Sequence, residues 1–125
     1  MRLLLDTHAL LWWLSDDQKL SAKVRALIED PTNQVYVSAV SGWEISIKQA
    51  LGKLDVDTSK LIDEVEKNGF SLLHVSFQHG IKAGTLPSHH RDPFDRMLIA
   101  QAQLEELKLV SVDACFAAYD VTLIW

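Results

Sequence analysis

The chain has 125 residues, a hydrophobic share of 48%, a charged share of 23% and a formal net charge of -5, from 17 acidic and 12 basic side chains. This length suits one domain over residues 1–125 that buries roughly two-thirds of its unfolded surface, so folding needs no metal or disulfide. The acidic balance argues against a protein that binds nucleic acid through a broad basic face. It permits an enzyme that reaches phosphates through cations held by carboxylates.

The cysteine content and the N-terminal pattern indicate a compartment. The single cysteine, Cys115, excludes an internal disulfide and suits the reducing cytosol. Asp6 and His8 interrupt the first apolar run, which therefore lacks the pattern of a signal peptide, and no window is apolar for long enough to cross a bilayer. We expect a cytoplasmic protein with no membrane partner.

The first predicted element is a short buried strand over residues 3–5. These are three leucines, and a continuous aliphatic run suits a central parallel strand that is covered on both faces. The run stops at Asp6, and residues 9–14 read as a helix, so Asp6 lies at a strand-to-helix switch. In an open α/β sheet this switch lies at the carboxyl edge, where ligands bind.

The remaining pattern alternates helices and strands. Helices are expected over residues 22–29 (with Ser21 as the N-cap), 39–51, 58–68, 77–83 and 92–107, with a short helix from Asp113. Further strands are expected over residues 34–37, 70–75, 109–112 and 121–124. This order predicts an α/β fold, a three-layer α/β/α sandwich whose central, mostly parallel, five-stranded sheet has residues 3–5 near its centre.

Glu44 lies on the apolar face of the helix predicted over residues 39–51. Val40, Ile47 and Leu51 form a stripe at helical spacing, and Glu44 falls inside it. A carboxylate that faces a core is costly unless it is paired or bound to a metal. The alternative is that Glu44 lies at the edge of the stripe and pairs with Lys48 one turn later.

Asp95 shares a predicted helix face with Leu98 and Ile99. The run from Asp92 to Asp95 also has the features of a helix start, with an N-cap, a proline at the first position and an acid at the third. Asp92 is most simply that N-cap. Asp95 can both stabilise the helix start and face a site.

Four acids map to the same edge of the predicted sheet: Asp6, Glu44, Asp95 and Asp113. Each acid alone could have a purely structural role, and Asp6 and Asp113 could each be a helix N-cap. Two carboxylates about 4 Å apart repel by roughly 4 kcal/mol at an effective dielectric near 20, so convergence demands divalent cations or raised pKa values. Oxygen ligands favour Mg²⁺ or Mn²⁺ over Zn²⁺, and cations held in this way can promote phosphodiester hydrolysis.

Four segments of the chain carry a family resemblance. They are Leu-Leu-Leu-Asp-Thr-His at residues 3–8, Ser38 followed by Trp-Glu-Ile at residues 43–45, Arg-Asp-Pro-Phe-Asp-Arg-Met-Leu-Ile-Ala-Gln-Ala at residues 91–102, and Val-Ser-Val-Asp at residues 110–113. Together they resemble the PIN domain, specifically the VapC-type toxins of toxin–antitoxin pairs. The resemblance spans essentially the whole chain and implies a single PIN-like nuclease domain over residues 1–125.

The resemblance implies a Mg²⁺- or Mn²⁺-dependent endoribonuclease that acts on RNA. Its catalytic and metal-binding acids would be Asp6, Glu44, Asp95 and Asp113, and Thr7 and Ser111 match the hydroxyl positions that accompany the first and fourth acids. Val112 stands where the fuller pattern often has a polar residue. The resemblance also implies a homodimer and a cognate VapB-type antitoxin that blocks the site.

Several other side chains have open interpretations. Lys48, Arg96 and the run His89-His90-Arg91 could supply positive charge for an RNA backbone, or the run could be an ordinary solvated loop. Three scattered histidines read as core or surface residues: His8, His74 and His79. Three tryptophans read mostly as core aromatics, although an exposed one could anchor a partner: Trp12, Trp13 and Trp43.

The residues near Asp6 argue against two other classes of protein that have an aspartate after the first strand. A phosphatase with an aspartyl nucleophile would have a second aspartate two positions later, where this chain has His8, and a receiver domain would need an acidic pair at this strand end. The rival that stays open is a PIN-like binding module that sequesters a partner or RNA without cleaving it.

Overall fold

The computed structural model describes residues 1–125. It has a single five-stranded sheet whose strands are β1 (Arg2–Leu5), β2 (Gln34–Ser38), β3 (Ser71–Leu73), β4 (Lys108–Val110) and β5 (Leu123–Ile124). The helices are α1 (Thr7–Leu14), α2 (Ala22–Glu29), α3 (Ala39–Ala50), α4 (Thr58–Lys67), α5 (Phe77–Thr85) and α6 (Pro93–Glu105), with a 3₁₀ helix, η1, at Ala114–Ala118. None of these helices combines the length and apolarity that a membrane span requires.

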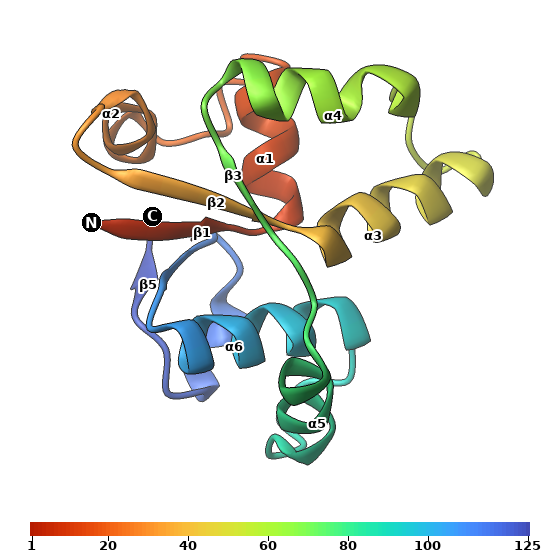
Figure 1. Ribbon diagram of the computed structural model, residues 1–125, viewed down its shortest axis with the longest axis vertical. Coiled ribbons are helices and arrows are strands. Elements are labelled where there is room, and N and C mark those ends of the chain that lie inside the picture. Colours follow the sequence, from red (N-terminus) through yellow and green to blue (C-terminus); the bar gives the residue numbers. More distant parts are fainter.

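The sheet is built around β1, as the leucine run predicted. The strand order is β3-β2-β1-β4-β5, and every pairing is parallel. Leu3, Leu4 and Leu5 are fully buried because both faces of the strand are covered. Leu3 and Leu5 pack on the side of α1 and α2, while Leu4 packs on the side of α6. Figure 1 shows the resulting layers, with α1, α2 and α4 on one side of the sheet and α5 and α6 on the other.

The edge strands are shorter than the sequence pattern predicted. The third strand was expected over residues 70–75 but pairs only over Ser71–Leu73, and the last was expected over residues 121–124 but pairs only over Leu123–Ile124. Each has a neighbour on one side alone, and short edge strands limit pairing with other chains.

The buried face of α3 is rotated from the predicted stripe. Val40, Glu44 and Ile45 are buried, whereas Leu51 is 63% exposed. The C-terminal half of α3 extends away from the sheet (Figure 1), which leaves Leu51, just after its last turn, outside the core. Trp43 lies on the outward face and is 60% exposed, so it is the exposed member that the sequence analysis allowed among the three tryptophans and not a core aromatic.

A truncation series would test the central role of β1. Replacing the fully buried Leu4 with alanine should lower the free energy of unfolding by about 2–5 kcal/mol, because it opens a cavity between the sheet and α6. The matched change Leu72→Ala in edge strand β3, where the side chain is 44% exposed, should cost less than about 1 kcal/mol. Urea unfolding measures both values, and equal losses would contradict the assignment of β1 as the core strand.

Candidate active site

Asp6 lies at the point where β1 becomes α1. Its backbone N–H continues the sheet by donating to the Val110 carbonyl at 3.0 Å, and its carboxylate caps α1 by accepting the Ala9 N–H at 2.8 Å. The residue is only 5% exposed. Burial raises the pKa of the Asp6 carboxyl, while a hydrogen bond from Ser111 opposes this rise. Asp6 is therefore an N-cap that also carries a poorly solvated negative charge.

Glu44 points into the protein from α3 with both carboxylate oxygens occupied. Thr7 Oγ1 donates to Oε1 at 2.6 Å, and Lys48 Nζ donates to Oε2 at 2.6 Å. Glu44 is 5% exposed, so the pairing with Lys48 occurs on the inward face and not at the stripe's edge. The hydrogen bond to Glu44 also raises the pKa of the Lys48 ammonium, with further contributions from Asp92 and Asp95. Lys48 thus serves as a cation beside three acids.

Asp95 lies in the first turn of α6, next to the predicted N-cap. Asp92 caps the helix by accepting the N–H groups of Phe94 and Asp95 at 2.8 and 3.1 Å, as expected. The Asp95 carboxylate oxygen Oδ2 lies 2.7 Å from His90 Nε2. Burial raises the pKa of Asp95 to about 6, the His90 contact opposes the rise, and the charges of Asp92 and Glu44 add to it. The negative charge of Glu44, on α3, is thus close enough to affect the ionisation of Asp95, on α6.

Asp113 follows β4 and caps η1. Its carboxylate accepts the Cys115 N–H at 3.0 Å, and this bond lowers the pKa of the exposed Asp113 carboxyl. Ser111 is buried, accepts the Asp113 N–H at 3.0 Å and lies close enough to the Asp6 carboxyl to lower its pKa. Ser111 therefore connects the two acids that end the neighbouring strands β1 and β4.

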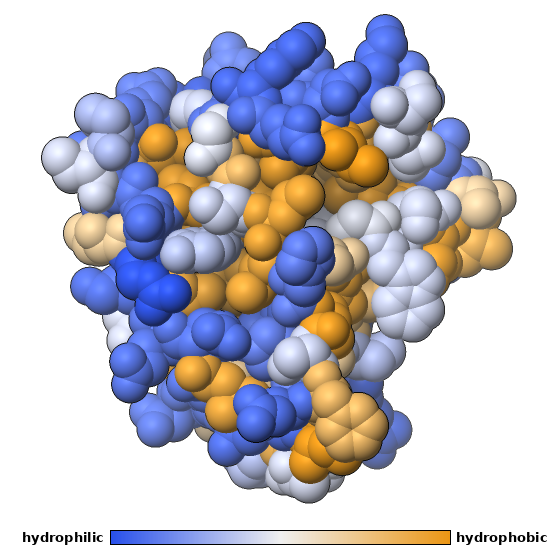
Figure 2. All heavy atoms as spheres, viewed as in Figure 1, coloured by the Kyte–Doolittle hydropathy of each residue, from blue (hydrophilic) through white to orange (hydrophobic).

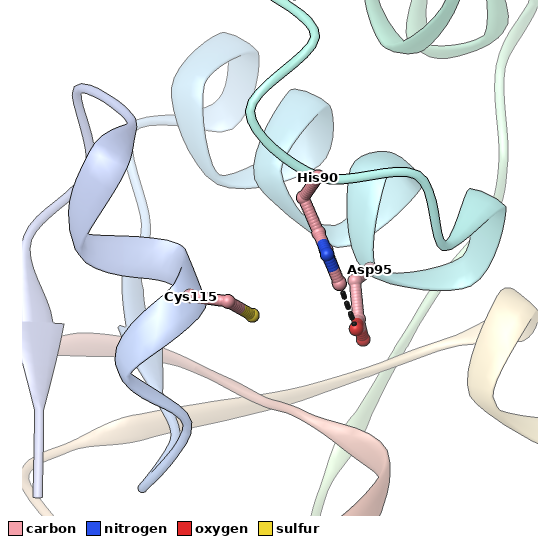
Figure 3. A group of neighbouring side chains, drawn as sticks. All are labelled: His90, Asp95 and Cys115. Carbon is pink, nitrogen blue, oxygen red and sulfur yellow. Dashed lines mark hydrogen bonds and ion pairs between the residues drawn. The ribbon is translucent and has the colours of Figure 1, made fainter.

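Contacts and charge effects relate the four acids at one edge of the sheet. Thr7 links the end of β1 to Glu44, the Glu44 charge acts on Asp95, and Ser111 links Asp113 back to Asp6. The carboxylates do not form a compact group, because no three of them offer ligand atoms within 4.8 Å of one another. The trio that meets this distance is His90, Asp95 and Cys115 (Figure 3).

These donors fit a hard divalent cation. Asp6 and Glu44 are almost fully buried and Asp95 is partly buried, while Lys48 is the cation that pairs with Glu44. Lys48 offsets only part of the negative charge of these acids, and buried carboxylates whose charge is not fully offset favour a metal ion, for which oxygen ligands suit Mg²⁺ or Mn²⁺. Asp6, Glu44, Asp95 and Asp113 are the residues that could hold it.

Arg96 turns away from this edge and holds the loop before α6. Its Nη2 donates to the carbonyls of Ala83 and Leu86 at 2.8 and 2.9 Å, and its Nη1 donates to the carbonyls of Pro87 and His90 at 3.0 and 3.1 Å. These bonds position the loop that carries His90, in place of the phosphate contact expected from the sequence.

Sequence reasoning missed two residues that the fold brings to the site. His90 was read either as positive charge for an RNA backbone or as part of a solvated loop, and Cys115 was considered for disulfides, yet each lies beside Asp95. Their proximity depends on how the loop before α6 meets η1, and no periodicity in the sequence reports that meeting. The other histidines follow the expectation, since His8 and His74 are exposed and His79 is buried against Glu105.

The raised pKa of Asp95 predicts a pH-dependent gain in stability for Asp95→Asn. The folded value of about 6 exceeds the ordinary 3.8, so the stability that comes from the protonated form is complete below pH 4 and is lost as the pH rises through 6. In protein stripped of divalent cations, Asp95→Asn should therefore raise the thermal midpoint more at pH 8 than at pH 5. Asp113→Asn is the control, because its lowered pKa means that the fold favours the charged form. Equal shifts at both pH values for Asp95→Asn would refute the assigned charge state.

The Lys48–Glu44 pair predicts a cation-dependent loss of stability. Lys48→Met leaves one buried Glu44 oxygen without a donor, which should lower the free energy of unfolding by about 1–3 kcal/mol in EDTA. Millimolar Mg²⁺ or Mn²⁺ should recover part of this loss by supplying the missing positive charge. The control Lys60→Met removes an exposed pair with Asp57, at 3.9 Å, and should change stability by less than about 0.5 kcal/mol. Denaturant titrations in which added cation makes no difference would argue against a metal near Glu44.

Comparison with known proteins places this arrangement in context. Residues 3–121 match the family model described as the PIN domain. The chain is 37% identical over 60 residues to Ribonuclease VapC16 of Mycobacterium tuberculosis (strain ATCC 25618 / H37Rv), an alignment that covers 46% of this chain and 43% of that protein. The match thus spans less than half of that relative's length.

Solved structures share the fold. The structure of VapBC2 from Rickettsia felis, bound to a DNA fragment from its promoter, is similar with a TM-score of 0.67 and 13% identity, covering 99% of this chain and 98% of that chain. A toxin–antitoxin complex from Klebsiella pneumoniae is similar with a TM-score of 0.67 and 18% identity, covering 98% and 95%. The family match over nearly the full length confirms the resemblance seen in the sequence: this chain belongs to the PIN domain family.

Proposed function

We propose that this protein is a Mg²⁺- or Mn²⁺-dependent endoribonuclease and the toxin of a toxin–antitoxin pair. The observation that carries the proposal is the set of four acids at one sheet edge, two of them nearly buried and with Lys48 as the only lysine in contact with the group. Membership of the PIN domain family supports it, as does the similarity to a protein named as a ribonuclease.

The residues of the site would have different roles in RNA hydrolysis. Asp6, Glu44, Asp95 and Asp113 would hold the cation. When bound, Mg²⁺ or Mn²⁺ supplies Lewis acidity, which activates water for attack on phosphorus and stabilises charge on the leaving oxygen.

Other side chains orient these acids and manage their charge. Thr7 fixes the Glu44 carboxylate through its 2.6 Å hydrogen bond, and Ser111 fixes Asp113. Lys48 provides positive charge beside Glu44. His90 Nε2 lies 2.7 Å from Asp95 Oδ2 and so orients the Asp95 carboxylate.

The partner proposed for this protein is a VapB-type antitoxin, and the proposed assembly contains a homodimer. An apolar cavity of about 250 Å³ lies between α1, α3, α4 and the edge of the sheet, lined by Leu10, Leu61, Ile62, Val65 and Leu72 among others. Figure 2 shows hydrophobic atoms gathered over the middle of the face that β3 crosses. Such a groove suits the apolar face of a partner helix. The structural neighbours described as toxin–antitoxin complexes support this assignment.

Glu44→Gln should separate cleavage from folding and partner binding. The change keeps the hydrogen-bond acceptor for Thr7 but removes the charge, so cleavage of RNA in Mn²⁺ should fall by roughly 10²-fold or more. Circular dichroism and copurification with the antitoxin should stay unchanged. The matched control is Glu66→Gln on the exposed face of α4, which should cleave at the wild-type rate. EDTA should abolish cleavage in every variant.

Two results would overturn the nuclease proposal. One is cleavage that persists in EDTA, since it excludes a metal mechanism. The other is a Glu44→Gln protein that stops growth as strongly as the wild type while cutting no RNA, which is the behaviour of a binding module.

A further inference from the structure

His90, Asp95 and Cys115 form a mixed nitrogen, oxygen and sulfur cluster beside the acidic edge. Their potential ligand atoms all lie within 4.8 Å of one another, and they come from the loop before α6, from α6 and from η1. Figure 3 shows the Cys115 side chain pointing toward the paired His90 and Asp95 side chains. The acids alone do not reach this degree of convergence.

The positions of these side chains are set by their surroundings. The backbone of His90 is held on both sides, because its N–H donates to Tyr119 Oη at 2.9 Å and its carbonyl accepts from Arg96 at 3.1 Å. The N–H of Cys115 donates to Asp113 at 3.0 Å, which fixes the start of η1. Ligands supported in this way are oriented before an ion arrives.

The ligand types select a different cation from the one that the four acids suit. An imidazole, a carboxylate and a thiol are typical zinc ligands, whereas Mg²⁺ binds oxygen and avoids sulfur. Ligand atoms around tetrahedral Zn²⁺ lie about 3.5 Å apart, so shifts on the order of 1 Å would bring the three into place.

The surroundings of the cluster also favour a cation. Asp113, whose carboxylate accepts the Cys115 N–H at 3.0 Å, and Asp92, which caps the helix that carries Asp95, add negative charge next to the three ligands. A metal ion that binds the sulfur takes the place of the thiol proton, so each ion bound would release one proton from the thiol to solvent.

We propose that His90, Asp95 and Cys115 are a Zn²⁺ site that shares Asp95 with the Mg²⁺ or Mn²⁺ centre, so that Zn²⁺ inhibits the enzyme. Three protein ligands leave a fourth position for water, as in open zinc sites. Binding of Zn²⁺ stands independently of the nuclease activity, whereas inhibition rests on the proposed function. Asp95 cannot serve both cations in the same way, and this conflict is the cause of inhibition.

Co²⁺ provides a spectroscopic test on the full chain. The purified protein, stripped with EDTA and dialysed, is titrated with Co²⁺, and a near-ultraviolet sulfur-to-cobalt charge-transfer band should appear at one ion per chain. Zn²⁺ should abolish the band stoichiometrically, whereas Mg²⁺, which competes for Asp95 alone, should weaken it only at a far higher concentration. Since Cys115 is the single cysteine, Cys115→Ser should remove the band, and it should weaken Zn²⁺ binding by more than about 10-fold.

Two histidines give a matched pair of variants. His90→Ala should weaken Zn²⁺ binding as Cys115→Ser does, whereas His89→Ala, one position earlier and packed edge-on against Tyr119, should bind like the wild type. Thermal midpoints of all variants establish that they are folded. In parallel, Zn²⁺ should inhibit Mn²⁺-dependent RNA cleavage by the wild type at concentrations at least about 10-fold lower than for Cys115→Ser.

The outcomes separate the two proposals. Absence of the charge-transfer band, or equal Zn²⁺ affinity in wild type, Cys115→Ser and His90→Ala, would overturn the zinc site. A Co²⁺ charge-transfer band that Zn²⁺ abolishes, in a protein that cuts no RNA, would support the site and refute the nuclease. Equal inhibition of wild type and Cys115→Ser would remove the link between this cluster and activity.

Discussion

The hydrogen bond from Thr7 to Glu44 is the contact on which the site depends. Thr7 follows the central strand directly, so its hydroxyl lies at the carboxyl edge of the sheet, and at 2.6 Å it holds a carboxylate that would otherwise be buried with one oxygen unsatisfied. This bond joins two segments that are 37 residues apart in the chain. Without it, the inward face of α3 would carry an acid that the core could not accept.

The acids at this edge of the sheet have pKa values that are shifted in opposite directions. Burial raises the pKa of Asp6 and of Asp95, whereas a backbone N–H lowers the pKa of Asp113. Lys48 neutralises part of the negative charge at Glu44. At Asp6 and Asp95 the fold therefore keeps acids whose ionisation costs stability, a pattern that is common at functional sites.

Asp95 takes part in three different interactions. It lies in the first turn of α6, interacts with the charges of Asp92 and Glu44, and pairs with His90 at 2.7 Å. Arg96, the next residue, uses its guanidinium to hold the loop that carries His90. The helix start thus couples an acid of the candidate metal centre to a nitrogen ligand on the preceding loop and a sulfur ligand on η1, so the two proposed cation sites share one residue.

The sequence by itself determined the parallel sheet, its leucine-rich central strand, and the placement of Asp6, Asp95, Asp92 and Asp113 at strand ends and helix starts. These follow from local rules. A continuous aliphatic run is buried, a helix start favours an N-cap residue, and the carboxyl ends of parallel strands lie at the same edge of the sheet. Tertiary structure alone decided the binding of Glu44 by Thr7, the exposure of Trp43, the use of Arg96 within a loop and the meeting of His90 with Asp95 and Cys115. Those outcomes depend on the rotation of α3 and on how a loop packs against η1, and contacts between distant segments leave no periodic trace in the chain.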